Sequence, residues 1–341
     1  MITLDGSHGE GGGQIIRIAL ALSMHTGQAF RAINIRAGRQ NPGLKAQHIA
    51  CINALTEISN ARAEHTGIGA NELTFYPGKI TKQKHTIDIG TAGSITLVLQ
   101  SLLLPLSFSS KKSKIKLIGG TDVPFSMPVD YFSNVLAPAL LPWAEIKTKL
   151  IQRGYAPEGK GVVEVSITPH EKPIVYVREQ KLQQVLIKGI SHATKNLEER
   201  QVAERQARAA EIVLNKLHLP VLISSEYVQT ADIKTCGSGI TLWLVCGEDE
   251  HAIQLGGSAL GSKRKTAEQV GQEAAQELIA VTQSEAPVDK HLADNLISWL
   301  GVAGKGSIQV QEITEHTKSA IYVVEQFLPV KFKIEGKNIQ L

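Results

Sequence analysis

Apolar stretches and polar loops alternate along the chain in an order that returns. The short apolar stretch from Ile2 to Leu4 predicts a strand, and a glycine-rich loop follows it. Apolar residues at helical spacing then predict a helix over Gln14 to Thr26. A strand over Ala32 to Arg36, a polar loop and a helix over Leu44 to Asn60 come next, before two short strand candidates, ARAEHTG and ELTFYPG. This order predicts one βαβα-type unit.

The same order returns twice further along the chain. The second copy begins with the strand TIDIG, a helix ending at Leu104, the strand KIKLIGG and a helix over Val129 to Leu140. It ends with two closing strands, AEIKTKLI and VVEVSITP. A third copy begins with a helix over His291 to Val302. The strand SIQVQEI, the loop TEHTK, a helix over Ala320 to Phe327 and a last strand candidate, LPVKFKIEG, complete it. Self-similarity of this kind indicates repeated structural units.

A different pattern separates the second and third copies. It consists of the strand QVLIKGI, a charged helix over Asn196 to Leu217, the strands PVLISSEYV, GITLWLVCG and HAIQLG, and a helix over Thr266 to Thr282. Strands mixed with two helices are typical of a small α+β domain. We therefore predict an α/β (α+β) fold of three repeated βαβα-type units around a pseudo-threefold axis. Residues 1–180 and 284–341 form the predicted catalytic domain, and residues 181–283 form the inserted small α+β domain.

Composition narrows the class of protein. The chain has 341 residues, of which 43% are apolar and 20% charged, as in ordinary globular proteins. A net charge of +4 permits a polyanionic ligand without requiring one. Cys51, Cys236 and Cys246 have no metal or redox spacing, and we expect reduced thiols. The N-terminus lacks a signal-peptide pattern, and the run Ile95 to Phe108 is too short for a bilayer, so we predict a cytoplasmic protein outside membranes.

Two glycine-rich stretches are candidates for anion binding. Gly9 to Gly13 lies between a strand and a helix, where backbone N–H groups can approach an anion, with Glu10 as the only side chain. A tight turn explains such a cluster equally well. Gln14 and Arg17 share one face of the following helix. The second stretch, Gly256 to Thr266, is displaced by one residue from a nucleotide-binding loop, and we predict a strand-to-helix turn with basic residues.

Equivalent loops of the three copies carry polar side chains. Arg36 and Arg39 lie in the first copy, Thr121 and Asp122 in the second, and His316 in the third. Copies packed around an axis would bring these loops to one end, where they could line one cleft. Taken singly, the arginines are more often salt-bridge partners, and a lone histidine is more often a surface or capping residue.

Seven motifs together carry a family resemblance. GEGGGQIIR, IRAGRQNPGLKAQH, the TAGS…LVLQ helix, GGTD, RGYAPEGKG, HLADN and EHTKSAIYVVEQFLPV resemble the RNA 3′-terminal phosphate cyclase family over nearly the whole chain. The resemblance implies three similar units with an inserted domain. It also implies ATP-dependent conversion of an RNA 3′-terminal phosphate to a 2′,3′-cyclic phosphodiester. The expected route passes through a covalent histidine–AMP intermediate and an adenylylated RNA end, and releases AMP and diphosphate.

The resemblance also implies roles for particular residues. His316 matches the adenylylated histidine, and Glu10 matches a carboxylate that contacts Mg²⁺ or Mn²⁺. Phosphate binding and charge compensation fall to four residues: Arg17, Arg36, Arg39 and His48. Contacts with ATP fall to a second set: Gln100, His291, Leu292, Ala293, Asp294 and Asn295. The expected partners are ATP and RNA with a 3′-phosphate end.

Departures from the family pattern leave some questions open. Asn295 replaces the usual glutamine, Lys160 stands in a glycine triplet, and Ala320 replaces a common asparagine, which affects details of nucleotide contact. A ribosome-assembly protein of the cyclase-like type would lack His316 and the Arg36–Arg39 loop. An enolpyruvyl transferase, with a distantly similar repeated architecture, would form no covalent nucleotide. The sequence does not decide between a monomer and a homodimer, or which RNAs and which metal are used.

Overall fold

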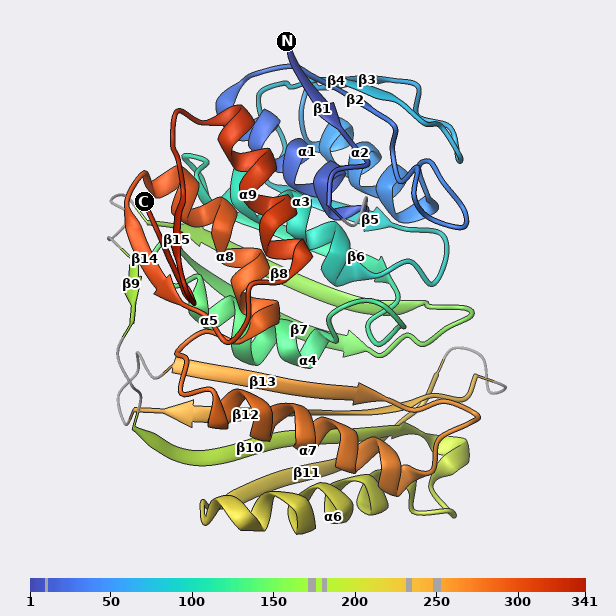
Figure 1. The fold of residues 1–341 in the computed structure, drawn as a ribbon. Helices are drawn as coiled ribbons and strands as arrows, with labels where there is room; N and C mark the ends of the chain where they lie inside the picture. Colours follow the sequence, from blue (N-terminus) through green and yellow to red (C-terminus); the bar gives the residue numbers. More distant parts are fainter. Residues whose placement is uncertain (10–11, 171–175, 180–182, 231–234, 248–252) are drawn as a thin grey trace.

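The computed structural model describes residues 1–9, 12–170, 176–179, 183–230, 235–247 and 253–341. Within these ranges the chain folds into four mixed sheets of four strands each, covered by helices (Figure 1). The prediction of an α/β (α+β) fold is therefore confirmed. None of the described helices is long and apolar enough to cross a lipid bilayer.

The first sheet has the strand order β1-β2-β4-β3. β1 and β2 run parallel, and β4 is antiparallel to both β2 and β3. Two helices, α1 and α2, belong to this part of the chain. The bounds are β1 (Ile2–Asp5), α1 (Gln14–Thr26), β2 (Phe30–Ile33), α2 (Ala46–Ile58), β3 (Arg62–Glu64) and β4 (Leu73–Tyr76).

The second sheet repeats this arrangement in the order β5-β6-β8-β7. Its bounds are β5 (Lys84–Asp88), α3 (Ile95–Ser107), β6 (Ser113–Gly119), β7 (Ala144–Gln152) and β8 (Gly161–Pro169). The predicted helix over Val129 to Leu140 is present but contains a π-helical segment, Phe132–Leu136, between α4 (Val129–Tyr131) and α5 (Ala137–Ala139). Pro138 has no N–H to donate to the preceding turn, which favours such a segment.

The third sheet has the equivalent order β9-β14-β16-β15. Its bounds are β9 (Tyr176–Arg178), α8 (Lys290–Ala303), β14 (Gly306–Gln309), α9 (Glu315–Phe327), β15 (Lys333–Glu335) and β16 (Asn338–Gln340). The predicted last strand, LPVKFKIEG, is present only over β15. The sequence prediction missed β16, which pairs with β15 in a hairpin because Gly336 at φ 61° turns the chain. β9 pairs in parallel with β14, so this sheet begins before residue 181. Three sheets thus share one strand order; a threefold axis between them stays a prediction.

The fourth sheet, which we call the small sheet, has the order β11-β10-β12-β13. Its bounds are β10 (Gln184–Thr194), α6 (Val202–Leu214), β11 (Val221–Val228), β12 (Ser238–Cys246), β13 (Ile253–Leu260) and α7 (Ala267–Gln283). α6 and α7 cover it on one side (Figure 1), and residues such as Ile187, Leu242 and Leu278 form a hydrophobic cluster of its own. The domain boundaries proposed from the sequence stay a prediction.

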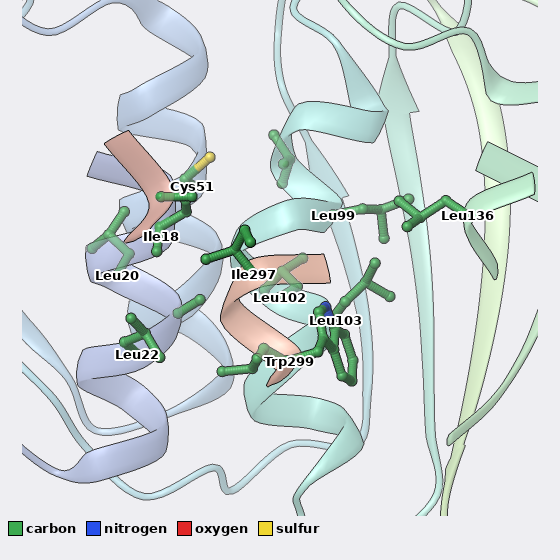
Figure 2. Close-up of a cluster of buried hydrophobic side chains, with 14 of the residues drawn as sticks. Ile18, Leu20, Leu22, Cys51, Leu99, Leu102, Leu103, Leu136, Ile297 and Trp299 are labelled. Carbon is green, nitrogen blue, oxygen red and sulfur yellow. The ribbon is translucent and has the colours of Figure 1, made fainter. Parts of the chain in front are cut away.

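Apolar helix faces fix the large core. Figure 2 shows Ile18 of α1, Leu99 and Leu102 of α3, and Ile297 and Trp299 of α8 meeting in one buried cluster. α1 also packs against α9, and α8 against α9. Truncation of one such leucine to alanine typically costs about 2–5 kcal/mol, so the relative positions of these helices are strongly specified.

Arg153 joins the second sheet to the small sheet. It is 2% exposed and donates to Asp122 Oδ2 at 3.1 Å, to Asp130 Oδ2 at 2.8 Å and, from Nε, to Glu226 Oε1 of β11 at 2.9 Å. Asp122 was expected at a common cleft; it lies instead in this buried network, because Arg153 satisfies its charge. Thr121, expected beside it, is 1% exposed and donates to the same carboxylate at 2.7 Å.

Candidate active site

The glycine-rich loop brings the start of α1 against α2. Gly13 precedes α1 without any side-chain cap, so the first backbone N–H groups of the helix are open to a ligand. A Cβ added at Gly13 would lie 2.0 Å from Nε2 of His48, so only glycine fits. Glu10 and Gly11 lie outside the described residues, and the metal contact expected of Glu10 stays a prediction.

A chain of side-chain hydrogen bonds connects α1, α3 and α8. Arg17 Nε donates to Gln100 Oε1 at 2.8 Å, and Gln100 Nε2 donates to Asn295 Oδ1 at 2.9 Å. Asn295 Nδ2 then donates to the His291 carbonyl oxygen at 2.8 Å. Each amide is oriented by its neighbour. Three residues that are far apart in sequence are therefore held in one defined arrangement.

Arg17 carries a charge that no described carboxylate balances. The residue is 8% exposed, and burial lowers the pKa of its guanidinium to about 10. Buried charges in proteins are normally paired, because removing an ion from water is costly. The planar fork of an arginine suits a phosphate. The buried Arg17 guanidinium therefore fits an anionic ligand at the start of α1.

His48 is held neutral beside Arg17. Its Nδ1 accepts a hydrogen bond from the Lys45 N–H at 2.9 Å, which assigns the ring proton to Nε2. Burial, followed by the positive charges of Arg17, Arg36 and Lys45, lowers the pKa of His48 to about 3. Nε2 is buried and has no partner among the described residues. His48 can thus donate a hydrogen bond toward the glycine loop, but it does not supply a positive charge.

His316 lies in the first turn of α9. The sequence prediction of a loop here and a helix only from Ala320 is wrong, because Thr314 caps the helix and accepts from Thr317 N–H at 3.0 Å. Asp294 Oδ1 accepts from the hydroxyls of Thr314 at 2.7 Å and Thr317 at 2.6 Å, and so ties α9 to α8. The T-x-x-T pattern of the sequence carried this capping signal. The half-buried His316 therefore lies on a helix turn fixed by hydrogen bonds, at the N-terminal end of α9, where the helix dipole is positive.

The glycine loop, the Arg39 loop and α9 converge on Gly12. A Cβ placed on Gly12 would lie 3.7 Å from Arg39 Nη2 and 3.8 Å from His316 Cε1. A Cβ on Gly9 would lie 2.7 Å from the Ser319 hydroxyl of α9. The structure thus brings the glycine loop, the Arg39 loop and the start of α9 together, next to the first turn of α1, which carries Arg17.

Arg36 fixes the backbone of the loop that carries Arg39. It has a left-handed backbone conformation, φ 56°, and its Nη1 donates to the carbonyl oxygens of Asn41 at 2.8 Å and Gly43 at 3.3 Å. Burial and the neighbouring Arg39 lower the pKa of Arg36. In the structure its guanidinium holds the turn that carries Arg39.

The run from His291 to Asn295 divides between two environments. Asp294 and Asn295 line a cavity of about 30 Å³ together with Gln14 and Gln100. Leu292 and Ala293 are 0% exposed and belong to the hydrophobic core. The His291 ring faces α7, where Nε2 lies 3.1 Å from Glu277 Oε1. Burial opposes the charged ring, but Glu277 outweighs it and raises the pKa of His291.

The described residues contain one cluster with the geometry of a metal site. Asp122, Asp130 and His192 offer ligand atoms within 4.8 Å of one another. Arg153 already donates to both carboxylates, and burial, which alone would raise the pKa of Asp122, is outweighed by His192 and Arg153, which lower it. A cation is therefore already present, and this cluster does not suit a divalent metal.

A glycine loop, a buried arginine and a histidine at a helix start together define a mixed α/β protein equipped to hold an anionic ligand. Comparison identifies its family: the family model described as RNA 3′-terminal phosphate cyclase matches residues 8–334. The chain belongs to this family.

Curated relatives match along their whole length. A Pyrococcus abyssi protein named RNA 3′-terminal phosphate cyclase is 45% identical over 338 residues, which cover 99% of this chain and 96% of the relative. An Archaeoglobus fulgidus protein of the same name is 44% identical over 342 residues, covering 99% of both chains. A third, from Methanosarcina acetivorans, is 43% identical over 361 residues and covers 99% of this chain and 98% of the relative.

Proposed function

We propose that this protein converts an RNA 3′-terminal phosphate into a 2′,3′-cyclic phosphodiester, consuming ATP and releasing AMP and diphosphate. The observation that carries the proposal is the buried Arg17 guanidinium, which lacks a described carboxylate partner, next to the point where Gly12, Arg39 and His316 converge. The family and the names of the relatives support the same reaction.

The first step loads AMP onto His316. A ring nitrogen of the neutral imidazole attacks the α-phosphorus of ATP, a P–N bond forms, and the bond to diphosphate breaks. Arg17 and Arg39 offset the charge that grows on the phosphoryl oxygens. The start of α9, fixed by Thr314 and Asp294, keeps the ring in place and adds the favourable potential of a helix N-terminus.

The remaining steps activate and close the RNA end. An oxygen of the 3′-phosphate attacks the phosphorus of the histidine-bound AMP, and the P–N bond breaks to leave an adenylylated end. The neighbouring 2′-hydroxyl then attacks the RNA phosphorus, and AMP leaves. Arg36 supports this step through the turn that carries Arg39. His48 donates from Nε2 beside Arg17 without adding charge.

Nucleotide and metal contacts complete the proposal. In this proposal Gln100 of α3 and Asp294 and Asn295 of α8 contact ATP, while His291, Leu292 and Ala293 belong to the part of α8 that precedes them. Mg²⁺ or Mn²⁺ at Glu10 would screen the triphosphate charge. We further propose that the protein is cytoplasmic and that residues 181–283 form an inserted domain.

The test is transfer of label from ATP labelled at the α-phosphate. We expect an acid-labile, base-stable label on the wild type with Mg²⁺ or Mn²⁺, and none on His316→Ala. His8→Ala is the matched control, because His8 also lies near the glycine loop and stacks on Tyr322 at 4.0 Å. Labelled His316→Ala would move the nucleophile elsewhere. An unlabelled wild type would favour a scaffold protein of the same family.

A further inference from the structure

A second cationic site lies on the small sheet, away from the glycine loop. A cavity of about 550 Å³ opens between the first turns of α6 and α7, beside the start of β12 and the connection 261–266. Figure 1 shows both helices beginning at the same end of the small sheet. Its described lining contains no acidic residue but five basic ones: Arg200, Arg205, Lys263, Arg264 and Lys265.

Only part of this charge is used within the fold. Arg205 makes a two-fold contact with Glu268, at 2.7 and 3.0 Å, and Lys265 pairs with Glu273. Arg200, Lys263 and Arg264 are exposed, and in the described part of the chain their side chains have no carboxylate partner. Three positive charges therefore face the cavity without a carboxylate partner among the described residues.

We propose that this cavity binds backbone phosphates of the RNA strand upstream of its 3′ end, an inference that rests on the proposed function. Flexible lysine and arginine side chains along an exposed connection suit a chain of phosphates. The described lining holds no aromatic residue on which a base or an adenine ring could stack. Binding should therefore be independent of sequence.

The separation of the two sites makes RNA length the variable to test. No residue lines both this cavity and the one beside Gln14, Gln100 and Asn295. A short RNA can occupy the end-binding site alone, whereas a longer strand can occupy both. We therefore expect KM to be lower for a long 3′-phosphorylated oligonucleotide than for a trinucleotide.

The first experiment reverses charge in the cavity. Lys263→Glu/Arg264→Glu should raise KM for the long RNA about tenfold, leave its kcat unchanged and leave the trinucleotide unaffected. Loss of two phosphate contacts should reduce the slope of log affinity against log salt by about 1.4. Lys216→Glu/Lys305→Glu is the matched control, because both lysines are exposed and carry the same charge outside the cavity.

The second experiment does not depend on catalysis. Cys236 lines the cavity and is exposed, whereas Cys51 and Cys246 are buried, so alkylation reports on this site. A long RNA with a 3′-hydroxyl, which cannot be cyclised, should slow alkylation in the wild type but not in Lys263→Glu/Arg264→Glu. Protection by inorganic phosphate or a mononucleotide as effective as that by RNA would overturn the proposal.

The two proposals fail differently. Cyclisation that has the same KM at every RNA length, with no protection of Cys236, overturns the RNA-binding cavity and leaves the cyclase proposal standing. Protection of Cys236 by RNA in a wild type that never takes label from ATP overturns the cyclase proposal and supports RNA binding by the cavity.

Discussion

The buried guanidinium of Arg17 is hydrogen-bonded to the side-chain amide of Gln100 and, among the described residues, has no carboxylate partner. The Gln100 oxygen orients the guanidinium at 2.8 Å but does not neutralise it. An unpaired buried charge of this kind lowers the stability of the free protein, and under the proposed function an anionic ligand would compensate it. Arg36 contrasts with it, because two carbonyl oxygens hold its guanidinium within its own turn.

Arg17→Met should therefore separate function from stability. We expect the rate of AMP transfer to fall by about 10²–10³-fold, as for loss of a charge-stabilising contact. The free energy of unfolding should rise by about 1 kcal/mol, because an unpaired buried charge is removed. Urea unfolding and single-turnover transfer measure the two effects. Arg36→Met is the control and should lose stability; a similar loss in Arg17→Met would show that Arg17 is structural.

The lowered pKa of His48 should make the free energy of unfolding depend on pH. Its folded pKa of about 3 lies below the ordinary value of about 6.5, so the unfolded chain binds this proton more readily. Stability from a neutral His48 is complete above about pH 6.5 and falls as the pH drops toward 3. The slope approaches about 1.4 kcal/mol per pH unit between these values.

The measurement compares His48→Asn with the wild type by urea unfolding at several pH values. The difference in unfolding free energy should shift with pH only in that window, because asparagine binds no proton. Parallel curves for the two proteins would contradict a neutral, buried His48.

At the scale of elements, the start of each helix decides what the site contains. α1 begins at a glycine with no side-chain cap, which leaves its N–H groups for a ligand. α9 begins at a threonine whose hydroxyl is used twice, so its first turn is fixed. Arg17 therefore lies in the first turn of a helix without a side-chain cap, α1, whereas His316 lies in the first turn of a capped helix, α9.

Gly13→Ala should destabilise the protein, because the added methyl group has no room beside α2. The new methyl would meet His48 Nε2, and overpacking of this kind costs about 1–3 kcal/mol. Gly38→Ala is a matched control in the neighbouring loop, since nothing lies within 4 Å of its added Cβ. In a double-mutant cycle, His48→Ala should relieve part of the cost, with a coupling of about 0.5–3 kcal/mol. Equal stability of Gly13→Ala and Gly38→Ala would contradict the packing.

The sequence predicts the long helices closely and the shortest elements poorly. α1, α7 and α8 end within a residue or two of their predicted bounds, because apolar spacing over several turns defines them. β9 and β16 have three residues each, too few to show a pattern. Their pairing comes from neighbours that are distant in sequence.

The candidate site shows the same division. Motif similarity points to Arg17, Gln100 and His316. The structure places Arg17 and His316 in the first turns of α1 and α9, and Gln100 in the middle of α3, where it accepts from Arg17. The motifs do not indicate that the His291 ring turns toward Glu277 or that Asp122 binds Arg153. Each contact joins two different elements, since Glu277 lies on α7 and Arg153 follows β7.

At the scale of the whole molecule, Arg153 connects the second sheet to the small sheet. Arg153 forms ion pairs with two buried aspartates, Asp122 and Asp130. The hydroxyl of the neighbouring Tyr155 lies 2.7 Å from Nδ1 of the buried His192. Asp289 adds a second connection, because it accepts from Tyr131 at 2.6 Å and from Gly256 N–H of β13 at 3.1 Å.

Arg153→Met should be among the most damaging single changes. Breaking a buried ion pair by removing one partner costs about 3–5 kcal/mol, because the remaining charges are left uncompensated. Arg31→Ala is the control; its pair with Glu72 is exposed, so little loss of stability is expected. Urea unfolding and limited proteolysis between the sheets measure the loss. Equal effects of the two variants would contradict a structural role for the buried network.

The pairing of β9 with β14 has a consequence for the synthesis of the protein. The whole small sheet is translated between these two neighbouring strands, so β9 leaves the ribosome long before its partner exists. The nascent chain acquires the glycine loop, Arg17 and Gln100 early, and α9 almost last. By the proposed mechanism, an unfinished polypeptide that lacks His316 cannot take AMP from ATP. Only complete copies of the protein then consume nucleotide.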